Sequence, residues 1–133
     1  MNNLRTYGQR PYGVAVIHGG PGAPGEMAPV ARELSKSVGV MEPLQTKKTL
    51  EGQVRELFAV ITKHGDIPVT LVGWSWGAWL GFIVAARHPT LVKKLVLIGS
   101  GAFEEKYAAN IVGDRLTRLT EAERVEALVD QIT

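Results

Sequence analysis

The segment IPVTLVGWSWGAWL, residues 67–80, gives the strongest structural signal in this chain of 133 residues. Its first half is apolar and rich in β-branched residues, which predicts a buried strand over Ile67–Gly73. Its second half begins a run that is apolar almost all round, which predicts a buried helix over Trp76–Arg87. Between the two, residues 73–77 match the pattern Gly-x-Ser-x-Gly. In a sharp strand-to-helix turn the serine hydroxyl projects above the sheet, and the glycines relieve crowding.

That placement makes Ser75 a candidate nucleophile, since the N-terminus of the helix after it favours developing negative charge. The alternative is a glycine-rich turn with no chemical role.

The chain contains no Cys, which excludes disulfides, thiolate metal sites and a cysteine nucleophile.

A second glycine-rich motif, HGGPG at residues 18–22, ends a predicted buried strand over Tyr12–His18. Glycines at this position let backbone N–H groups approach a substrate carbonyl closely. Together with the N–H of Trp76, they predict an oxyanion hole for a tetrahedral intermediate. The loop donor is Gly19 or Gly20, because a proline has no N–H. A plain turn or a phosphate loop is the alternative, although neither of the common nucleotide-binding glycine patterns is present.

Side chains beside the two motifs are candidates for substrate contact, and we expect His18, Pro21, Gly22 and Trp74 to contribute to the substrate site. We expect the imidazole to orient the loop rather than to act as a base. The tryptophans on either side of Ser75 are candidates to line an acyl or amine pocket. No cluster has metal-ligand spacing, and no cofactor is expected.

The remaining signals predict strands that alternate with helices. They indicate a helix beginning near Pro29, a strand over Val38–Met41, a helix from Leu50 to about Lys63 capped by Thr49, and a strand over Leu95–Ile98. The alternation predicts an α/β fold, with a parallel sheet of about four strands and helices on both faces. Residues 1–11 carry weak signals, and only helical signal follows residue 101.

Composition narrows the classes of function. Apolar residues make up 45% of the chain and charged residues 21%, as in globular proteins. The net charge of +2, without a basic run, argues against nucleic-acid binding. The longest strongly apolar stretch is far shorter than the roughly 20 residues of a membrane helix. No signal peptide is visible. We therefore expect a cytoplasmic protein that binds neither nucleic acid nor membrane.

The HGGPG loop and the GWSWG turn together resemble the α/β-hydrolase family, and in particular its proline iminopeptidase-like branch. The resemblance implies that Ser75 is the nucleophile and that Trp76, with Gly19 or Gly20, supplies the oxyanion hole. It implies a partial hydrolase core over residues 1–101 and the start of a helical cap over residues 102–133. The chain looks like the N-terminal half of such an enzyme, with a truncated fold.

The chain departs from the family where the catalytic acid and histidine are expected. After Ser75 the only histidine is His88, which at 1.5 Å per helical residue lies roughly 18–20 Å from the serine. Glu104 and Glu105 follow the last predicted strand, but an exposed start of the cap is the simpler interpretation. The family's antiparallel front strands have no obvious counterpart before Tyr12.

We therefore expect a serine hydrolase acting on an ester, amide or N-terminal peptide bond of a small molecule or short peptide, inactive as this chain alone. The alternative is a degenerate, non-catalytic module that binds a ligand or partner. The predicted edge strand Leu95–Ile98 and an apolar helical stripe suggest self-association or pairing with a missing C-terminal half, with the stripe favoured. That stripe comprises Leu116, Leu119, Val125, Leu128, Val129 and Ile132.

Overall fold

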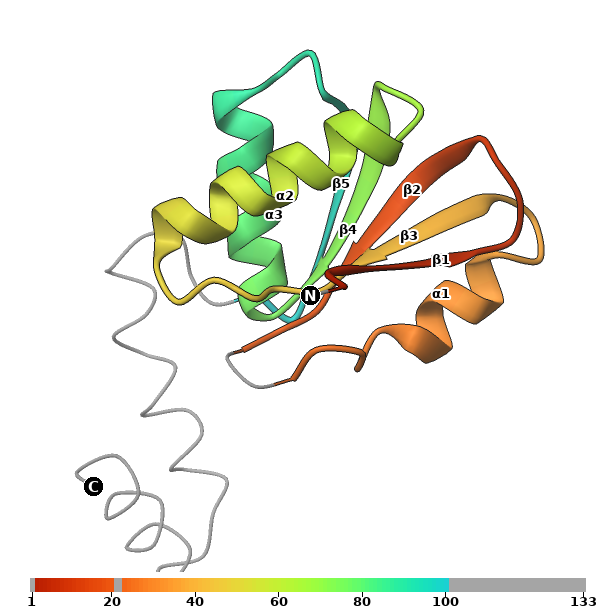
Figure 1. Ribbon diagram of the computed structural model, residues 1–133, viewed down its shortest axis with the longest axis horizontal. Coiled ribbons are helices and arrows are strands. Elements are labelled where there is room, and N and C mark those ends of the chain that lie inside the picture. Colours follow the sequence, from red (N-terminus) through yellow and green to blue (C-terminus); the bar gives the residue numbers. More distant parts are fainter. Residues whose placement is uncertain (1, 21–22, 101–133) are drawn as a thin grey trace, which may run out of the picture. The chain divides into compact units, whose positions relative to one another are not determined.

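The computed structural model describes residues 2–20 and 23–100. In order along this part of the chain, the elements are β1 (Leu4–Tyr7), β2 (Tyr12–Ile17), α1 (Ala28–Leu34), β3 (Gly39–Pro43), α2 (Leu50–His64), β4 (Val69–Trp74), α3 (Trp76–Arg87) and β5 (Val92–Ile98). The strands form one sheet in the order β1-β3-β2-β4-β5. β1 runs antiparallel to β3, and the other neighbours are parallel (Figure 1).

The predicted alternation of strands and helices is confirmed, with α3 at its predicted bounds. Thr49 caps α2, since its hydroxyl accepts a hydrogen bond from the Gly52 N–H at 3.0 Å. The predicted parallel sheet of about four strands is confirmed. The expectation that no antiparallel front strand precedes Tyr12 is wrong, because residues 4–7 pair antiparallel with β3 and make a fifth strand. Only Leu4 and Tyr7 are apolar in this strand, so its sequence carries little strand signal.

Helices cover both faces of the sheet, as predicted: α2 and α3 lie on one face and α1 on the other (Figure 1). The residues of β2 alternate between two cores. Ala15 and Ile17 pack with α2 and α3, whereas Val16 packs on the α1 side with Met27. This two-sided burial explains why the parallel strands read as continuous apolar runs.

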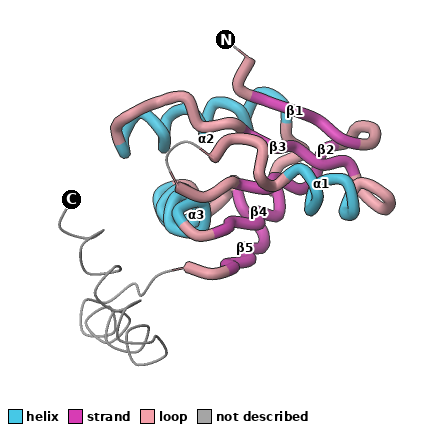
Figure 2. Tube along the Cα trace, turned by 90° about the horizontal axis from the view of Figure 1, so that it is seen from below, coloured by secondary structure: helices cyan, strands magenta, loops and turns pink. Residues whose placement is uncertain are grey.

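β5 lies at one edge of the sheet (Figure 2). Its final residues Val96, Leu97 and Ile98 are each between 37% and 39% exposed. The chain separates into two units, Met1–Ser100 and Gly101–Thr133. The predicted start of a helical cap, its apolar stripe, and Glu104 and Glu105 lie outside the described residues.

Candidate active site

Ser75 occupies the turn between β4 and α3, where it has φ 53° and ψ −116°. It is the one residue other than glycine with a positive φ in the part of the chain that the structure describes. Such a conformation costs on the order of 1–3 kcal/mol and persists only where the surroundings hold it. One restraint is visible: the Ser75 N–H donates to the Ile98 carbonyl at 2.9 Å. The predicted strained turn is therefore confirmed.

Both glycines of the Gly-x-Ser-x-Gly pattern are required by close packing of backbone. A Cβ on Gly73 would lie 2.4 Å from the Gly77 carbonyl oxygen, and a Cβ on Gly77 would lie 2.2 Å from the Ile17 carbonyl oxygen. Real Cβ atoms essentially never approach other atoms so closely. The turn is thus pressed against the end of β2, which carries the second motif.

The HGGPG loop lies against this turn. A Cβ on Gly19 would lie 3.2 Å from the Ser75 Cβ and 3.0 Å from Cδ1 of Trp74. Because Gly20 is bonded to Gly19, it too lies within about 10 Å of the serine, as the site assignment requires. A Cβ on Gly20 would meet nothing within 4 Å. Pro21 and Gly22 lie outside the described residues.

The hydrogen bonds of Gly19 distinguish between the two candidate oxyanion donors. Its N–H donates to Oε1 of Glu26 at 2.5 Å, and its carbonyl oxygen lies 2.8 Å from Nδ1 of His18. The N–H of Gly20 has no hydrogen-bond partner among the described residues. Of the two loop amides, Gly20 is therefore the one available to a substrate oxygen.

His18 is buried, with 1% of its surface exposed, and both ring nitrogens are occupied. The backbone N–H of Gln45 donates to Nε2 at 2.9 Å, so Nδ1 carries the ring proton and donates to Gly19. The Gln45 side chain also donates to the His18 carbonyl at 2.8 Å. In this arrangement the imidazole has no free lone pair with which to take a proton from Ser75. Any contribution of His18 to substrate binding comes from its position in the loop.

The two tryptophans beside Ser75 differ in their surroundings. Trp76 donates from Nε1 to Oε1 of Gln53 on α2 at 2.7 Å, which fixes its indole against that helix. Trp74 is 42% exposed and packs near Gly99, where a Cβ would lie 2.9 Å from its ring. Trp74 thus has an open surface beside the serine, which itself is exposed.

His88 lies at the far end of α3 from Ser75, where it follows the last helical residue and its ring is 4.3 Å from that of Phe58. In residues 2–20 and 23–100, no three or more His, Asp or Glu side chains are grouped to hold a metal ion.

Sequence reasoning missed Glu26, Gln45 and Gln53 as neighbours of the site. The contacts of Gln45 and Gln53 join segments distant in sequence, and Glu26 lies outside the HGGPG motif, so no motif marks these residues.

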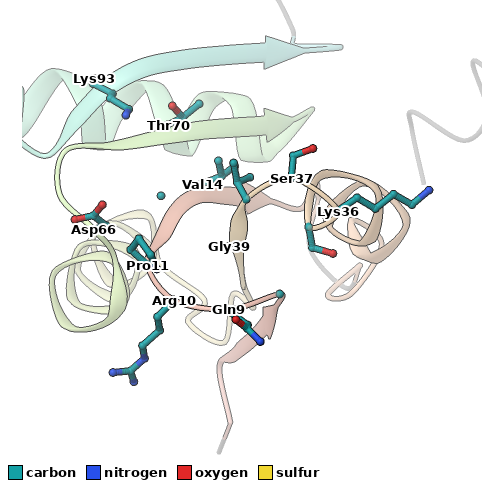
Figure 3. Close-up of a pocket in the computed structure, with 14 residues that line it drawn as sticks. Gln9, Arg10, Pro11, Val14, Lys36, Ser37, Gly39, Asp66, Thr70 and Lys93 are labelled. Carbon is teal, nitrogen blue, oxygen red and sulfur yellow. The ribbon is translucent and has the colours of Figure 1, made fainter.

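A cavity of about 640 Å³ lies away from Ser75, at the amino ends of the parallel strands. Gly13, Thr70 and Lys93 line it, at the beginnings of β2, β4 and β5. Figure 3 shows the Arg10 and Lys36 side chains directed away from this cavity. The strained Ser75 and the glycine-rich loop lie at the opposite end of the sheet, and we place the candidate site there. Within the described part of the chain, no helix is long and apolar enough to cross a membrane.

Comparisons with known proteins agree with the α/β fold described above. A family model described as the alpha/beta hydrolase fold matches residues 43–126. A serine hydrolase involved in carbazole degradation has 28% sequence identity and a TM-score of 0.66, covering 78% of this chain and 45% of that one. A mutant epoxide hydrolase from Bacillus megaterium has 20% identity and a TM-score of 0.70, covering 87% and 48%.

An epoxide hydrolase from Vigna radiata has 22% identity and a TM-score of 0.67, and the match covers 97% of this chain and 49% of that one. The chain thus spans about half the length of the solved structures it matches. No curated protein sequence matches the chain.

Proposed function

Because the chain belongs to the family with the alpha/beta hydrolase fold, we propose that it carries the nucleophile and oxyanion hole of a serine hydrolase. The bond cleaved is an ester, an amide or an N-terminal peptide bond in a small molecule or short peptide. The HGGPG sequence at residues 18–22 favours a proline iminopeptidase-like enzyme, and hence an N-terminal peptide bond. The strained conformation of Ser75 beside Gly19 is the observation that carries this proposal.

In the proposed reaction, the Ser75 Oγ attacks the substrate carbonyl carbon and forms a new C–O bond. The electron pair of the carbonyl moves to its oxygen, which becomes an oxyanion. The N–H groups of Gly20 and Trp76 hold that charge, and the N-terminal end of α3 adds a favourable dipole. The leaving group departs when the carbonyl re-forms, and water then hydrolyses the acyl-enzyme.

The proton of the serine hydroxyl needs an acceptor, and neither His18 nor His88 supplies one. His18 has both nitrogens occupied, and His88 lies at the far end of α3. We propose that the catalytic histidine and acid come from a continuation of the polypeptide or from another chain. This chain alone therefore turns over activated esters slowly or not at all, since only about 10³–10⁴-fold catalysis remains without the triad.

Labelling with diisopropyl fluorophosphate tests the proposal without needing turnover. The Ser75 Oγ forms a bond to phosphorus, fluoride leaves, and the hydroxyl proton passes to imidazole, which is added to the buffer as a base in place of the missing histidine. We expect intact-protein mass spectrometry to detect one adduct, which peptide mapping assigns to Ser75. Ser75→Ala abolishes it, and Ser37→Ala, at an exposed serine far from the turn, retains it. An adduct that persists in Ser75→Ala refutes the assignment.

A second candidate function is a non-catalytic module that keeps the pocket and binds a small molecule or partner. The occupied nitrogens of His18 favour it, because they prevent the histidine nearest to Ser75 in the HGGPG loop from acting as its base. The same labelling separates the two functions, since a module without a working nucleophile site gives no adduct at Ser75. Enzyme-like turnover, about 1–10³ per second, from this chain alone would instead reveal a base, and His18→Ala is then the first variant to test.

We also propose that the chain associates, either with a second copy or with a separate C-terminal half. The outer side of β5 has no neighbouring strand among the described residues. An unpaired parallel strand offers free N–H and C=O groups to a partner. The exposed side chains of Val96, Leu97 and Ile98 add apolar surface at the same edge.

A further inference from the structure

The carboxylate of Glu26 holds the loop residue that lies against Ser75. We propose that Glu26 is a positioning residue of the oxyanion hole, acting through the Gly19 N–H to fix the direction of the neighbouring Gly20 N–H. This inference rests on the proposed function, because it assigns a role within the same site. It concerns a residue that neither the HGGPG motif nor the Gly-x-Ser-x-Gly motif contains.

Glu26 is well placed to act as a fixed acceptor. Its carboxylate accepts the Gly19 N–H at 2.5 Å. The next residue, Met27, is 4% exposed and packs in the core on the α1 side of the sheet. The preceding Gly25 has φ +93°, a turn conformation that glycine adopts at little cost. The main chain of Glu26 is therefore anchored, although its side chain is exposed.

The opposite side of Gly19 is held by His18 and Gln45. The ring donates from Nδ1 to the Gly19 carbonyl oxygen, and the Gln45 N–H bound at Nε2 fixes that tautomer. The Gly19 carbonyl belongs to the same planar peptide unit as the Gly20 N–H. In a trans peptide the C=O and N–H point in opposite directions. Restraining this carbonyl therefore aims the Gly20 N–H away from His18.

The bond from Glu26 restrains the preceding peptide unit, so the two together fix both sides of the Gly19 Cα. This restraint matters because glycine has more backbone freedom than any other residue. Without the carboxylate, Gly19 can rotate, and its own N–H competes for the substrate oxygen. The space around the loop does not prevent such rotation at Gly20, where an added Cβ would meet nothing within 4 Å.

The rate of Ser75 labelling by diisopropyl fluorophosphate measures this effect, since the phosphoryl oxygen occupies the oxyanion hole as the adduct forms. We expect Glu26→Ala to lower the second-order rate constant about tenfold, less than the 10²–10³-fold loss when an oxyanion donor is removed outright. We expect Glu26→Gln, which retains an acceptor oxygen, to restore the rate to within about threefold of wild type. Glu33→Ala, at an exposed glutamate on α1, is the matched control and keeps the wild-type rate.

The outcomes separate this inference from the proposed function. No adduct at Ser75 in the wild-type chain refutes the proposed function. An adduct that forms equally fast in wild type and Glu26→Ala refutes only the positioning role. A purely steric role of the side chain is also refuted if Glu26→Gln restores the labelling rate and Glu26→Leu does not. If Glu26→Ala does not fold, hydrogen exchange of the Gly19 N–H in wild type decides: strong protection supports the inference, and rapid exchange overturns it.

Discussion

Gly77 packs directly on the end of β2, where its Cβ position would lie 2.2 Å from the Ile17 carbonyl oxygen. The first turn of α3 therefore sits on the strand that leads into the HGGPG loop. Parallel pairing of Ile17 with Gly73 brings the same two segments together within the sheet. These contacts explain why the candidate nucleophile Ser75 and the glycine-rich loop, distant in sequence, meet at one place.

Gly77→Ala should destabilise the chain severely, by about 4 kcal/mol or more, because the clash involves backbone atoms that cannot move aside. Gly81→Ala on the same helix is the matched control. There the new Cβ meets only side-chain methyl groups, the nearest at 3.3 Å. Alanine also favours the helix by up to about 1 kcal/mol. Urea unfolding measures the free energy of unfolding of both variants, and equal values would disprove the packing argument.

Ser75→Gly should be more stable to unfolding than Ser75→Ala, by about 1 kcal/mol. Glycine relieves the strain at φ 53°, worth on the order of 1–3 kcal/mol, while its greater freedom in the unfolded chain offsets part of the gain. Alanine leaves the strain in place. Chemical denaturation of both variants provides the test, and a glycine variant less stable than the alanine variant would argue against a strained turn.

Tyr7→Phe should lower the free energy of unfolding by about 1–3 kcal/mol near neutral pH. The phenol donates to Oε1 of Glu42 at 2.7 Å, and that carboxylate is fully buried. Its other oxygen, Oε2, has no hydrogen-bond partner among the described residues, so the tyrosine bond matters more. Arg5 stands 3.9 Å from Oε1 and does not replace it. Tyr12→Phe is the control, and it should lower the free energy of unfolding less than Tyr7→Phe does.

The same tyrosine should make stability fall at alkaline pH. Burial, and next the Glu42 carboxylate, raise the pKa of Tyr7 above its ordinary value. A raised pKa in the folded state means that the contribution is complete below the unfolded pKa of about 10 and is lost as pH rises through the folded pKa. The free energy of unfolding, measured from pH 8 to 11, should therefore decline less in Tyr7→Phe than in wild type. If the two variants lose stability in parallel as the pH rises, Tyr7 is excluded as the source of the alkaline decline.

Leu97→Lys should weaken self-association, because it places a charge at the exposed edge of the sheet. Val38→Lys, at an apolar residue that is 43% exposed and away from β5, is the control and should associate like wild type. Sedimentation velocity across a hundredfold dilution measures the change. A monomer at every concentration in wild type would refute association. Val125→Glu with Leu128→Glu tests the predicted stripe, which lies outside the described residues.

The parallel core and the Ser75 turn could be predicted because their signals are local. An apolar strand, two glycines around a serine and an apolar helix follow one another directly, and backbone sterics link that order to one geometry. The positive φ of Ser75 and its closeness to Gly19 are confirmed on this basis. The sequence does not distinguish Gly19 from Gly20 as the loop residue with a free N–H, because that choice depends on the contact of Gly19 with the Glu26 carboxylate.

β1 and the burial of Glu42 were missed for a different reason. Glu42 is a charged residue directly before a proline, yet it is fully buried in β3. Its partners Tyr7 and Arg5 come from β1, an edge strand with little apolar character. Only the pairing of the two strands places these groups together, and no periodicity in either segment records it.

The order of strands in the sheet has a consequence for how the molecule folds. The register that joins Ile17 to Gly73 closes a long loop of chain, and the entropy of that closure must be overcome before the contacts form. Chains dominated by such non-local pairing fold more slowly than helical bundles of similar size. The Ser75 turn and the HGGPG loop thus come together only once the central strands have paired, so a partly folded chain lacks the proposed active site.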